Sequence, residues 1–281
     1  MPIIKNGSNV SIKAIKIGTN KFSYTNTCAF DSLLQLFTAG YFDKEEIKKF
    51  ISQKESNTFF KLVLDAATRG ITRQSYKLRA QILNETEIFT RKLLPNNIIL
   101  IDCVANVGSL ANKLFAKCPP FEEISKCSNG CVERKKEFPL MHADINLLTR
   151  QDFKALENTI IIEGARHCCR INCNGLEETM FSHSGPYVML ETYAYEGVPE
   201  IKLRDIPKKI KFTFLEKEYY LIGIVNYTGL KKQTRHSTIG HYTTICYRSN
   251  NKWIKYDDCK DAEETLNENY IISPQIVLYA I

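Results

Sequence analysis

The chain has 281 residues, of which 44% are apolar and 25% charged, and its net charge is +7. This is the composition of a globular protein with enough length for a substantial core, and no apolar run is long enough to span a membrane. Residues 1–16 lack the apolar segment of a signal peptide, so we expect an intracellular protein, in the cytoplasm or nucleus. Ten cysteines in such a protein favour thiol chemistry or metal binding over a disulfide framework.

The positive charge is scattered along the chain. Short basic runs occur at residues 134–136 and 231–232, a pattern typical of a solvated basic surface. The sequence shows neither a helix-turn-helix signature nor an RNP-like aromatic motif. Nucleic acid is therefore not an expected partner.

Residues 24–37 form the first informative stretch. Four apolar residues recur there at helical spacing: Phe30, Leu33, Leu34 and Phe37. Asn26 or Thr27 can cap the start of this helix, which places Cys28 in its first turn. Unpaired N–H groups and the helix dipole favour a thiolate at that position. On this stretch alone, a buried structural cysteine fits equally well.

The remaining pattern predicts helices first and strands later. Helices are expected at residues 43–52, 58–67, 73–83, 84–94 and 109–115, with Asp43 and Glu46 as a capping-box pair for the first of these. Strands are expected at residues 140–147, 159–163, 187–193, 209–215, 219–227, 242–247, 252–256 and 275–280. This order indicates the α+β class rather than a parallel α/β sheet.

A hairpin is expected near the carboxyl end. Two loosely alternating segments flank the polar turn Ser249-Asn250-Asn251, with His241 opening the first and Asp257 closing the second. The two ends of an antiparallel hairpin lie side by side, so a carboxylate can hold the imidazole in one tautomer. A cysteine protease needs such a histidine beside its thiolate.

Together these two stretches resemble the cysteine and histidine boxes of the ubiquitin-specific proteases. The matching residues are Asn26-Thr27-Cys28 with Ser32 to Gln35, then Gly240-His241-Tyr242 and Trp253 to Asp258. The resemblance implies Cys28 as nucleophile, His241 as general base and Asp257 as orienting acid, with Asp258 as an assisting neighbour.

The resemblance also implies a papain-like fold in a single catalytic domain. It divides the chain into a helical thumb with the cysteine box (1–116), β fingers with cysteine knuckles (117–200) and an antiparallel β palm with the histidine box (201–281).

Several positions depart from the family pattern. The family usually has Gly before Asn-Thr-Cys, an aromatic residue after it and then Asn-Ser, where this chain has Thr25, Ala29 and Asp31-Ser32. The family often places an oxyanion-donating Asn five residues before the cysteine, where Ser23 stands here. Loss of such a donor costs roughly 10²–10³ in rate. Ser23, Asn26 or the backbone N–H of Cys28 are the candidate replacements.

Two cysteine pairs have the spacing of metal knuckles. Cys127 and Cys131 form the first, and we favour Cys169 with Cys173 as the second because it mirrors that spacing. Cys168 is the alternative to Cys169. Four thiolates suit structural zinc, and in the resembling family such knuckles sit at the tip of the fingers.

The expected function is that of a thiol-dependent deubiquitinase. By this resemblance the chain would cleave after the C-terminal glycine of ubiquitin or a ubiquitin-like modifier such as SUMO, as a monomer without a membrane partner or catalytic cofactor. One alternative is a weak or inactive relative that binds ubiquitin or SUMO. A second is a zinc-stabilised interaction or nucleic-acid-binding module.

Overall fold

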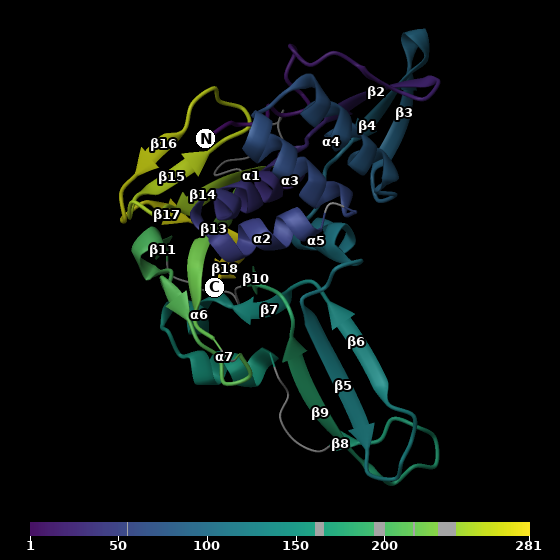
Figure 1. The fold of residues 1–281 in the computed structure, drawn as a ribbon, viewed down its shortest axis with the longest axis vertical. Helices are drawn as coiled ribbons and strands as arrows, with labels where there is room; N and C mark the ends of the chain where they lie inside the picture. The colour runs from purple at the N-terminus through teal and green to yellow at the C-terminus, as the bar shows by residue number, and fades with distance from the viewer. Residues whose placement is uncertain (55, 161–165, 194–199, 216, 230–239) are drawn as a thin grey trace.

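A computed structural model describes residues 1–54, 56–160, 166–193, 200–215, 217–229 and 240–281. Helices gather around α1 (Cys28–Asp43), a large sheet flanks them, and a narrow sheet projects away from both (Figure 1). The α+β class predicted from the sequence is confirmed. Among the described residues, no helix is both long and apolar enough to cross a bilayer.

Helix α1 is the centre of the fold, and every residue from Cys28 to Gly40 is buried. Strands β13 (Tyr219–Thr228) and β14 (His241–Tyr247) pack against it, as do helices of the thumb. Those in contact with α1 are α2 (Glu45–Gln53), α3 (Thr58–Arg69) and α5 (Val107–Phe115), whereas α4 (Arg73–Glu85) packs against α3. The rings of Phe37, Phe59, Phe60 and Phe115 contact one another between them, mostly edge to face. This aromatic cluster fixes the position of α1.

Local capping explains where several helices begin and end. The Asn57 side chain accepts hydrogen bonds from the first turn of α3, and Thr72 with Ser75 forms a capping box at α4. The predicted capping pair of Asp43 and Glu46 is wrong. Asp43 is the last residue of α1, and its carboxylate binds the guanidinium of Arg248 at 2.5 and 3.0 Å.

The thumb also contains a four-stranded sheet, in the order β1-β2-β4-β3, that the sequence prediction missed. Its strands are β1 (Ile15–Ile17), β2 (Asn20–Thr25), β3 (Thr90–Leu94) and β4 (Ile98–Asp102). The helix expected over residues 84–94 is therefore wrong from residue 86 onward, because α4 ends at Glu85. The turn η1 (Pro95–Asn97) reverses the chain through positive φ angles at Asn96 and Asn97. Strand β3 can then pair with β4, and that pairing outweighs the local helical pattern.

The palm is an eight-stranded sheet, ordered β16-β15-β14-β13-β18-β10-β7, with β12 (Lys209–Ile210) paired to β13. Its other strands are β7 (Met141–Asp144), β10 (Tyr187–Tyr193), β15 (Trp253–Tyr256), β16 (Glu264–Leu266) and β18 (Pro274–Ala280). All its pairs are antiparallel except β10 with β7. Strands β11 (Ile201–Lys202) and β17 (Ile271–Ile272) form a separate pair, and η2 (Leu203–Asp205) follows β11.

The fingers are a second four-stranded sheet, in the order β6-β5-β9-β8. It comprises β5 (Phe121–Cys127), β6 (Arg134–Phe138), β8 (Arg166–His167) and β9 (Leu176–His183), and it projects from the body in Figure 1. Not all of residues 117–200 belong to it, because β7 and β10 join the palm. The run Tyr187–Leu190 is buried on both faces and needs a sheet interior.

Two further helices lie between β7 and β8, namely α6 (Ile145–Thr149) and α7 (Phe153–Ile160). The strand expected over residues 159–163 falls partly in α7, and its remainder lies outside the described residues.

Candidate active site and cysteine cluster

Cys28 is the first residue of α1 and is 7% exposed. The backbone carbonyl of Thr27 accepts the hydrogen bond from the Asp31 N–H, which closes the first turn of the helix. The buried stripe of α1 anchors this turn against β14, where the Thr244 hydroxyl donates to the Ser32 carbonyl at 2.7 Å. The thiol therefore occupies a fixed position next to the strand that His241 begins.

His241 lies between Cys28 and two carboxylates. Its Nε2 atom is 2.9 Å from Oδ1 of Asp257 and 3.5 Å from Oδ1 of Asp258. The Cys28 thiol lies beside the imidazole and helps to raise the pKa of His241. Because Nε2 faces the carboxylates, Nδ1 is the ring nitrogen that is left for the thiol. The structure thus brings all three residues of the expected triad together.

The carboxylate and the thiol act on the histidine in the same direction. The hydrogen bond to Asp257, followed by the interaction with Cys28, raises the pKa of His241 to about 10. Burial raises the pKa of Asp257, but hydrogen bonds from His241 and the Cys259 N–H outweigh burial, so this pKa lies below its ordinary value. At neutral pH the pair is an imidazolium beside a carboxylate.

The backbone around the site leaves little space. A Cβ atom at Gly240 would lie 2.0 Å from the Tyr227 hydroxyl, and one at Gly108 would lie 1.9 Å from a carboxylate oxygen of Glu191. A larger residue at the start of β14 or in the first turn of α5 would therefore have to displace the Tyr227 or Glu191 side chain. Residues 230–239, which precede Gly240, lie outside the described part of the chain.

The candidate oxyanion donors lie just before the nucleophile. Asn26 has a positive φ of 56°, and its Nδ2 atom donates to Oδ1 of Asp102 at 2.8 Å. Ser23 lies in β2, in register with Leu100 of β4. Asn26 is thus held in one orientation two residues before Cys28 and still has a second amide N–H.

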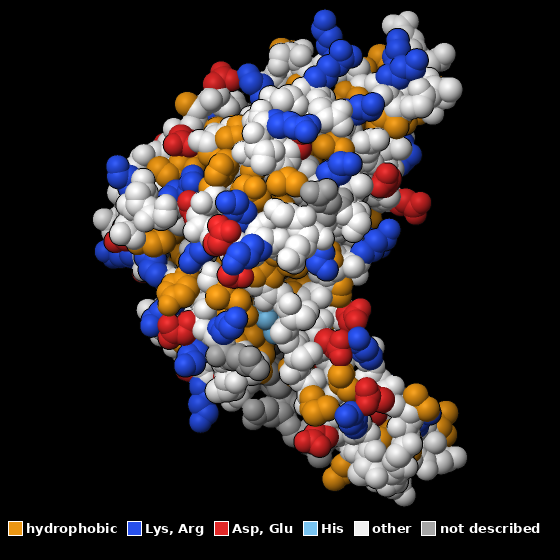
Figure 2. Space-filling view, viewed as in Figure 1, with side chains coloured by type: hydrophobic (Ala, Val, Ile, Leu, Met, Phe, Trp, Pro, Cys, Tyr) orange, Lys and Arg blue, Asp and Glu red, His pale blue; other side chains and the backbone are white. Residues whose placement is uncertain are grey.

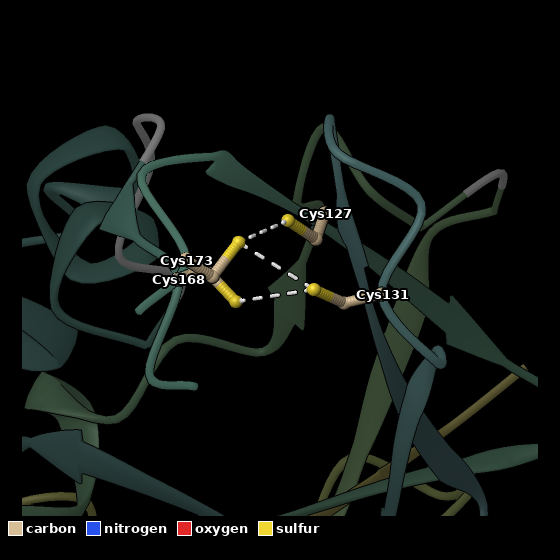
Figure 3. Close-up of side chains that lie close together, drawn as sticks. All are labelled: Cys127, Cys131, Cys168 and Cys173. Carbon is tan, nitrogen blue, oxygen red and sulfur yellow. Dashed lines mark hydrogen bonds between the residues drawn. The ribbon is translucent and has the colours of Figure 1, made fainter. Parts of the chain in front are cut away.

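Four cysteines meet at the tip of the fingers: Cys127, Cys131, Cys168 and Cys173 (Figure 3). The Sγ atom of Cys173 lies 3.6 Å from that of Cys127 and 3.5 Å from that of Cys131. The Cys168 and Cys131 sulfurs are 3.9 Å apart.

The structure brings Cys168, the alternative, into the cluster and leaves the preferred Cys169 outside it. Cys168 is buried and points into the cluster, whereas the adjacent Cys169 is exposed. Backbone N–H groups of Asn129 and Gly175 donate to the sulfurs of Cys127 and Cys173, both at 3.4 Å. These hydrogen bonds fix the positions of two of the four sulfurs.

A second group of metal-ligand types lies in the active site itself. One ligand-type atom from each of His241, Asp257, Asp258 and Cys259 lies within 4.8 Å of the others. Hydrogen bonds among these side chains account for their closeness. The Cys259 thiol donates to Asp258 at 3.5 Å, and its backbone N–H donates to Asp257 at 3.0 Å.

Comparison with known proteins places the chain in a family. A family model described as "Ubiquitin carboxyl-terminal hydrolase" matches residues 41–279. The chain belongs to this family. The match covers most of the chain, including His241, Asp257 and the four clustered cysteines, and it begins after Cys28. The resemblance drawn from the two sequence boxes is confirmed.

The individual relatives share little sequence identity with this chain. The chain is 24% identical over 296 residues to a Drosophila melanogaster protein, the "120.7 kDa protein in NOF-FB transposable element". The match covers 99% of this chain and 26% of that protein, so the chain spans about a quarter of its relative.

Among solved structures, the chain is similar to the SAGA Ubp8–Sgf11–Sgf73–Sus1 deubiquitinase module. The identity is 15% with a TM-score of 0.47, over 95% of this chain and 66% of that one. A structure of a SAGA module with the same four proteins, bound to monoubiquitin, matches at 14% identity and a TM-score of 0.46, over 100% of this chain and 71% of that one.

The pattern of motifs did not identify one charged residue beside the site. Arg79 of α4 is 1% exposed and pairs with Asp31 of α1 at 2.9 Å. The sequence feature that could have indicated a buried cation is Asp31, because a carboxylate on the buried side of a helix requires a buried partner.

Proposed function

We propose that this chain is a cysteine-type deubiquitinase that hydrolyses the bond after the C-terminal glycine of ubiquitin or a ubiquitin-like modifier. The observation that carries this proposal is the placement of Cys28 beside His241, which hydrogen-bonds to Asp257 at 2.9 Å, in a chain of the ubiquitin carboxyl-terminal hydrolase family. A thiol at a helix start, an imidazole and an orienting carboxylate are the three parts of nucleophilic thiol catalysis.

The geometry supports the following reaction. The Cys28 sulfur, whose proton His241 has taken at Nδ1, attacks the carbonyl carbon of the modifier's terminal glycine. The resulting tetrahedral intermediate collapses when His241 donates that proton to the lysine amine, which leaves. His241 then takes a proton from water, the hydroxide attacks the thioester, and Cys28 is regenerated with release of the glycine carboxylate. Asp257 keeps the ring in one orientation throughout.

We assign the oxyanion position to Asn26 and the Cys28 backbone N–H. The hydrogen bond to Asp102 orients the Asn26 amide, and oriented donors stabilise a developing negative charge without reorganisation. Ser23 has a shorter side chain and lies further along β2 from the nucleophile.

A zinc ion held by Cys127, Cys131, Cys168 and Cys173 is the second part of this proposal. Tetrahedral coordination with Zn–S bonds of about 2.3 Å requires sulfurs about 3.8 Å apart. Three of the Sγ separations, 3.5 to 3.9 Å, fit that requirement, and all four sulfurs lie within 4.8 Å of one another. The ion would cross-link the tip of the finger sheet. Figure 2 shows the outline hollowed where this sheet leaves the body, which offers a concave surface to a folded modifier.

Hydrolysis of fluorogenic C-terminal amides of ubiquitin and of SUMO tests the proposal. The wild-type protein should release the fluorophore from one of them, and Cys28→Ala and His241→Gln should not. The departures from the family pattern at Ser23 and Ala29 favour one rival function, binding of a modifier without cleavage. Saturable binding by folded wild-type protein, with no turnover of either substrate, would establish that rival and refute the hydrolase.

A further inference from the structure

Asp31 lies one helical turn after Cys28, with its side chain inside the protein. It is 2% exposed, and its two carboxylate oxygens each lie 2.9 Å from Nη1 of Arg79. The Thr27 hydroxyl also donates a short hydrogen bond to it. A buried carboxylate is stable only when it is paired in this way. Arg79 thus binds the turn that carries the nucleophile.

Arg79 has a second anchor in the amino-terminal segment. Its Nη1 atom donates to the Lys5 carbonyl at 2.8 Å. The adjacent residue, Asn6, donates from Nδ2 to Oδ2 of Asp258 at 2.6 Å and from its backbone N–H to the Asp258 carbonyl at 2.9 Å. The same segment therefore contacts both Arg79 and the carboxylate beside His241.

Asp31 and Asp258 complete the connection. Both line one small cavity, where their carboxyl groups interact electrostatically, and Oδ1 of Asp258 lies 3.5 Å from Nε2 of His241. A continuous polar path therefore runs from Arg79 through Asp31 and Asp258 to the catalytic histidine. Thr27, which donates to Asp31, directly precedes Cys28 in the chain, and Asp258 directly follows Asp257.

Asp31 and Asp258 are both buried, and the guanidinium of Arg79 pairs with only one of them. One guanidinium balances one carboxylate, so the two carboxyl groups are stable together when they share one proton. Burial raises the pKa of both groups, to about 8 for Asp31. The other polar groups that face the pair are Thr27, Asn6, Cys259 and His241. Gln35 and Tyr256 line a cavity of about 10 Å³ beside it, roughly the size for one water.

We propose that Arg79 and Asp31 are positioning residues that hold the Cys28 turn and the Asp258 carboxyl in register, and so fix the nucleophile against its base. This inference rests on the proposed function. The departure from the family pattern at residue 31 agrees with this proposal. Asp31 stands where the family usually has Asn, and a carboxyl group with a shared proton offers a hydrogen-bond donor and an acceptor, as an amide does.

The test is the rate of Cys28 alkylation by iodoacetamide between pH 5 and 10, read by mass on Cys28, since it needs no modifier. Arg79→Met removes both anchors and should slow alkylation at pH 7 by about 10- to 100-fold. Arg79→Lys keeps the charge, but its shorter side chain cannot place the cation where Nη1 contacts both Asp31 and the Lys5 carbonyl. Its rate should lie between those of the wild type and Arg79→Met. Lys77→Met on the exposed face of α4 is the matched control and should match the wild type.

The variant Asp31→Asn distinguishes a positioning role of this carboxyl group from a contribution to stability alone. Asn can donate a side-chain hydrogen bond to Asp258 but has no shared proton to lose, so its rate at pH 7 should stay within about threefold of wild type. Above pH 8 the wild type should lose alkylation rate relative to Asp31→Asn, as its two carboxylates begin to repel. The inference would be overturned if wild type and Asp31→Asn had the same pH profile of alkylation and if folded Arg79→Met and Arg79→Lys were alkylated at the wild-type rate. Wild-type protein that alkylates fast but hydrolyses no modifier would refute only the proposed function.

Discussion

The Nε2 atom of His241 lies 2.9 Å from Oδ1 of Asp257, across the open end of the β14–β15 hairpin. The Thr244–Tyr256 pair continues this ladder toward the turn, so the register of the hairpin determines the distance between the two side chains. Since a slip of one residue would turn either side chain to the other face, the register of these strands is a condition for the site.

Asp257→Asn should lower kcat/KM by about 10²–10⁴, because the amide cannot stabilise the imidazolium and favours the wrong tautomer. The rate of hydrolysis of the fluorogenic substrate measures this loss in kcat/KM. Asp261→Asn is the control, since Asp261 is an exposed carboxylate that pairs only with Lys5 at 2.6 Å among the described residues. Equal losses in both variants would remove Asp257 from the triad.

The His241–Asp257 pair should make stability depend on pH. His241 has a raised folded pKa, so its contribution is complete below its ordinary pKa of 6.5 and is lost as the pH rises toward about 10. Asp257 has a lowered folded pKa, so its contribution is complete above 3.8 and is lost as the pH falls below that value. Urea unfolding should therefore show the largest difference between wild type and His241→Gln at about pH 4–6.5. A difference that grows from pH 7 to 10 would contradict this assignment.

Cys168→Ser should abolish zinc binding, whereas Cys169→Ser should retain it. The two positions are adjacent, but only Cys168 lies in the cluster. Metal analysis after dialysis against zinc-free buffer compares them directly. We also expect Cys168→Ser to expose the finger tip to proteolysis, because structural zinc contributes folding free energy. Zinc retained by Cys168→Ser and lost by Cys169→Ser would reverse the ligand assignment.

Asn26→Ala should lower kcat by about 10²–10³ with little change in KM, because an oxyanion donor acts in the transition state. Ser23→Ala should keep its rate. Steady-state kinetics on the same substrate distinguish the two. If the effects were exchanged, Ser23 would be the donor and the Asn26–Asp102 hydrogen bond would be structural.

Local patterns account for the parts of the site that the sequence predicted. A helix start with an apolar stripe places Cys28, and a hairpin with a polar turn places His241 opposite Asp257; each depends on neighbouring residues only. The choice between Cys168 and Cys169 depended on the direction of the backbone at the second knuckle, which spacing does not encode. Strand β3 was predicted as helix because Pro95–Asn97 has the pattern of a helix stop, whereas it is the turn of a hairpin between β3 and β4.

The Arg79–Asp31 pair could not be predicted from local sequence patterns either. Asp31 was visible as a departure from the family pattern, but its partner is 48 positions away in another helix. Only the packing of α4 against the amino-terminal segment brings the guanidinium to it.

The central claim is that Cys28 is the nucleophile of a deubiquitinase. The most direct measurement is the intact mass of zinc-replete protein after incubation with ubiquitin and with SUMO that carry a C-terminal electrophile, alongside Cys28→Ala. We predict a single adduct with one probe, located on Cys28 by peptide mapping and absent from Cys28→Ala. No adduct with either probe on folded protein, or an adduct that persists in Cys28→Ala, would contradict the claim.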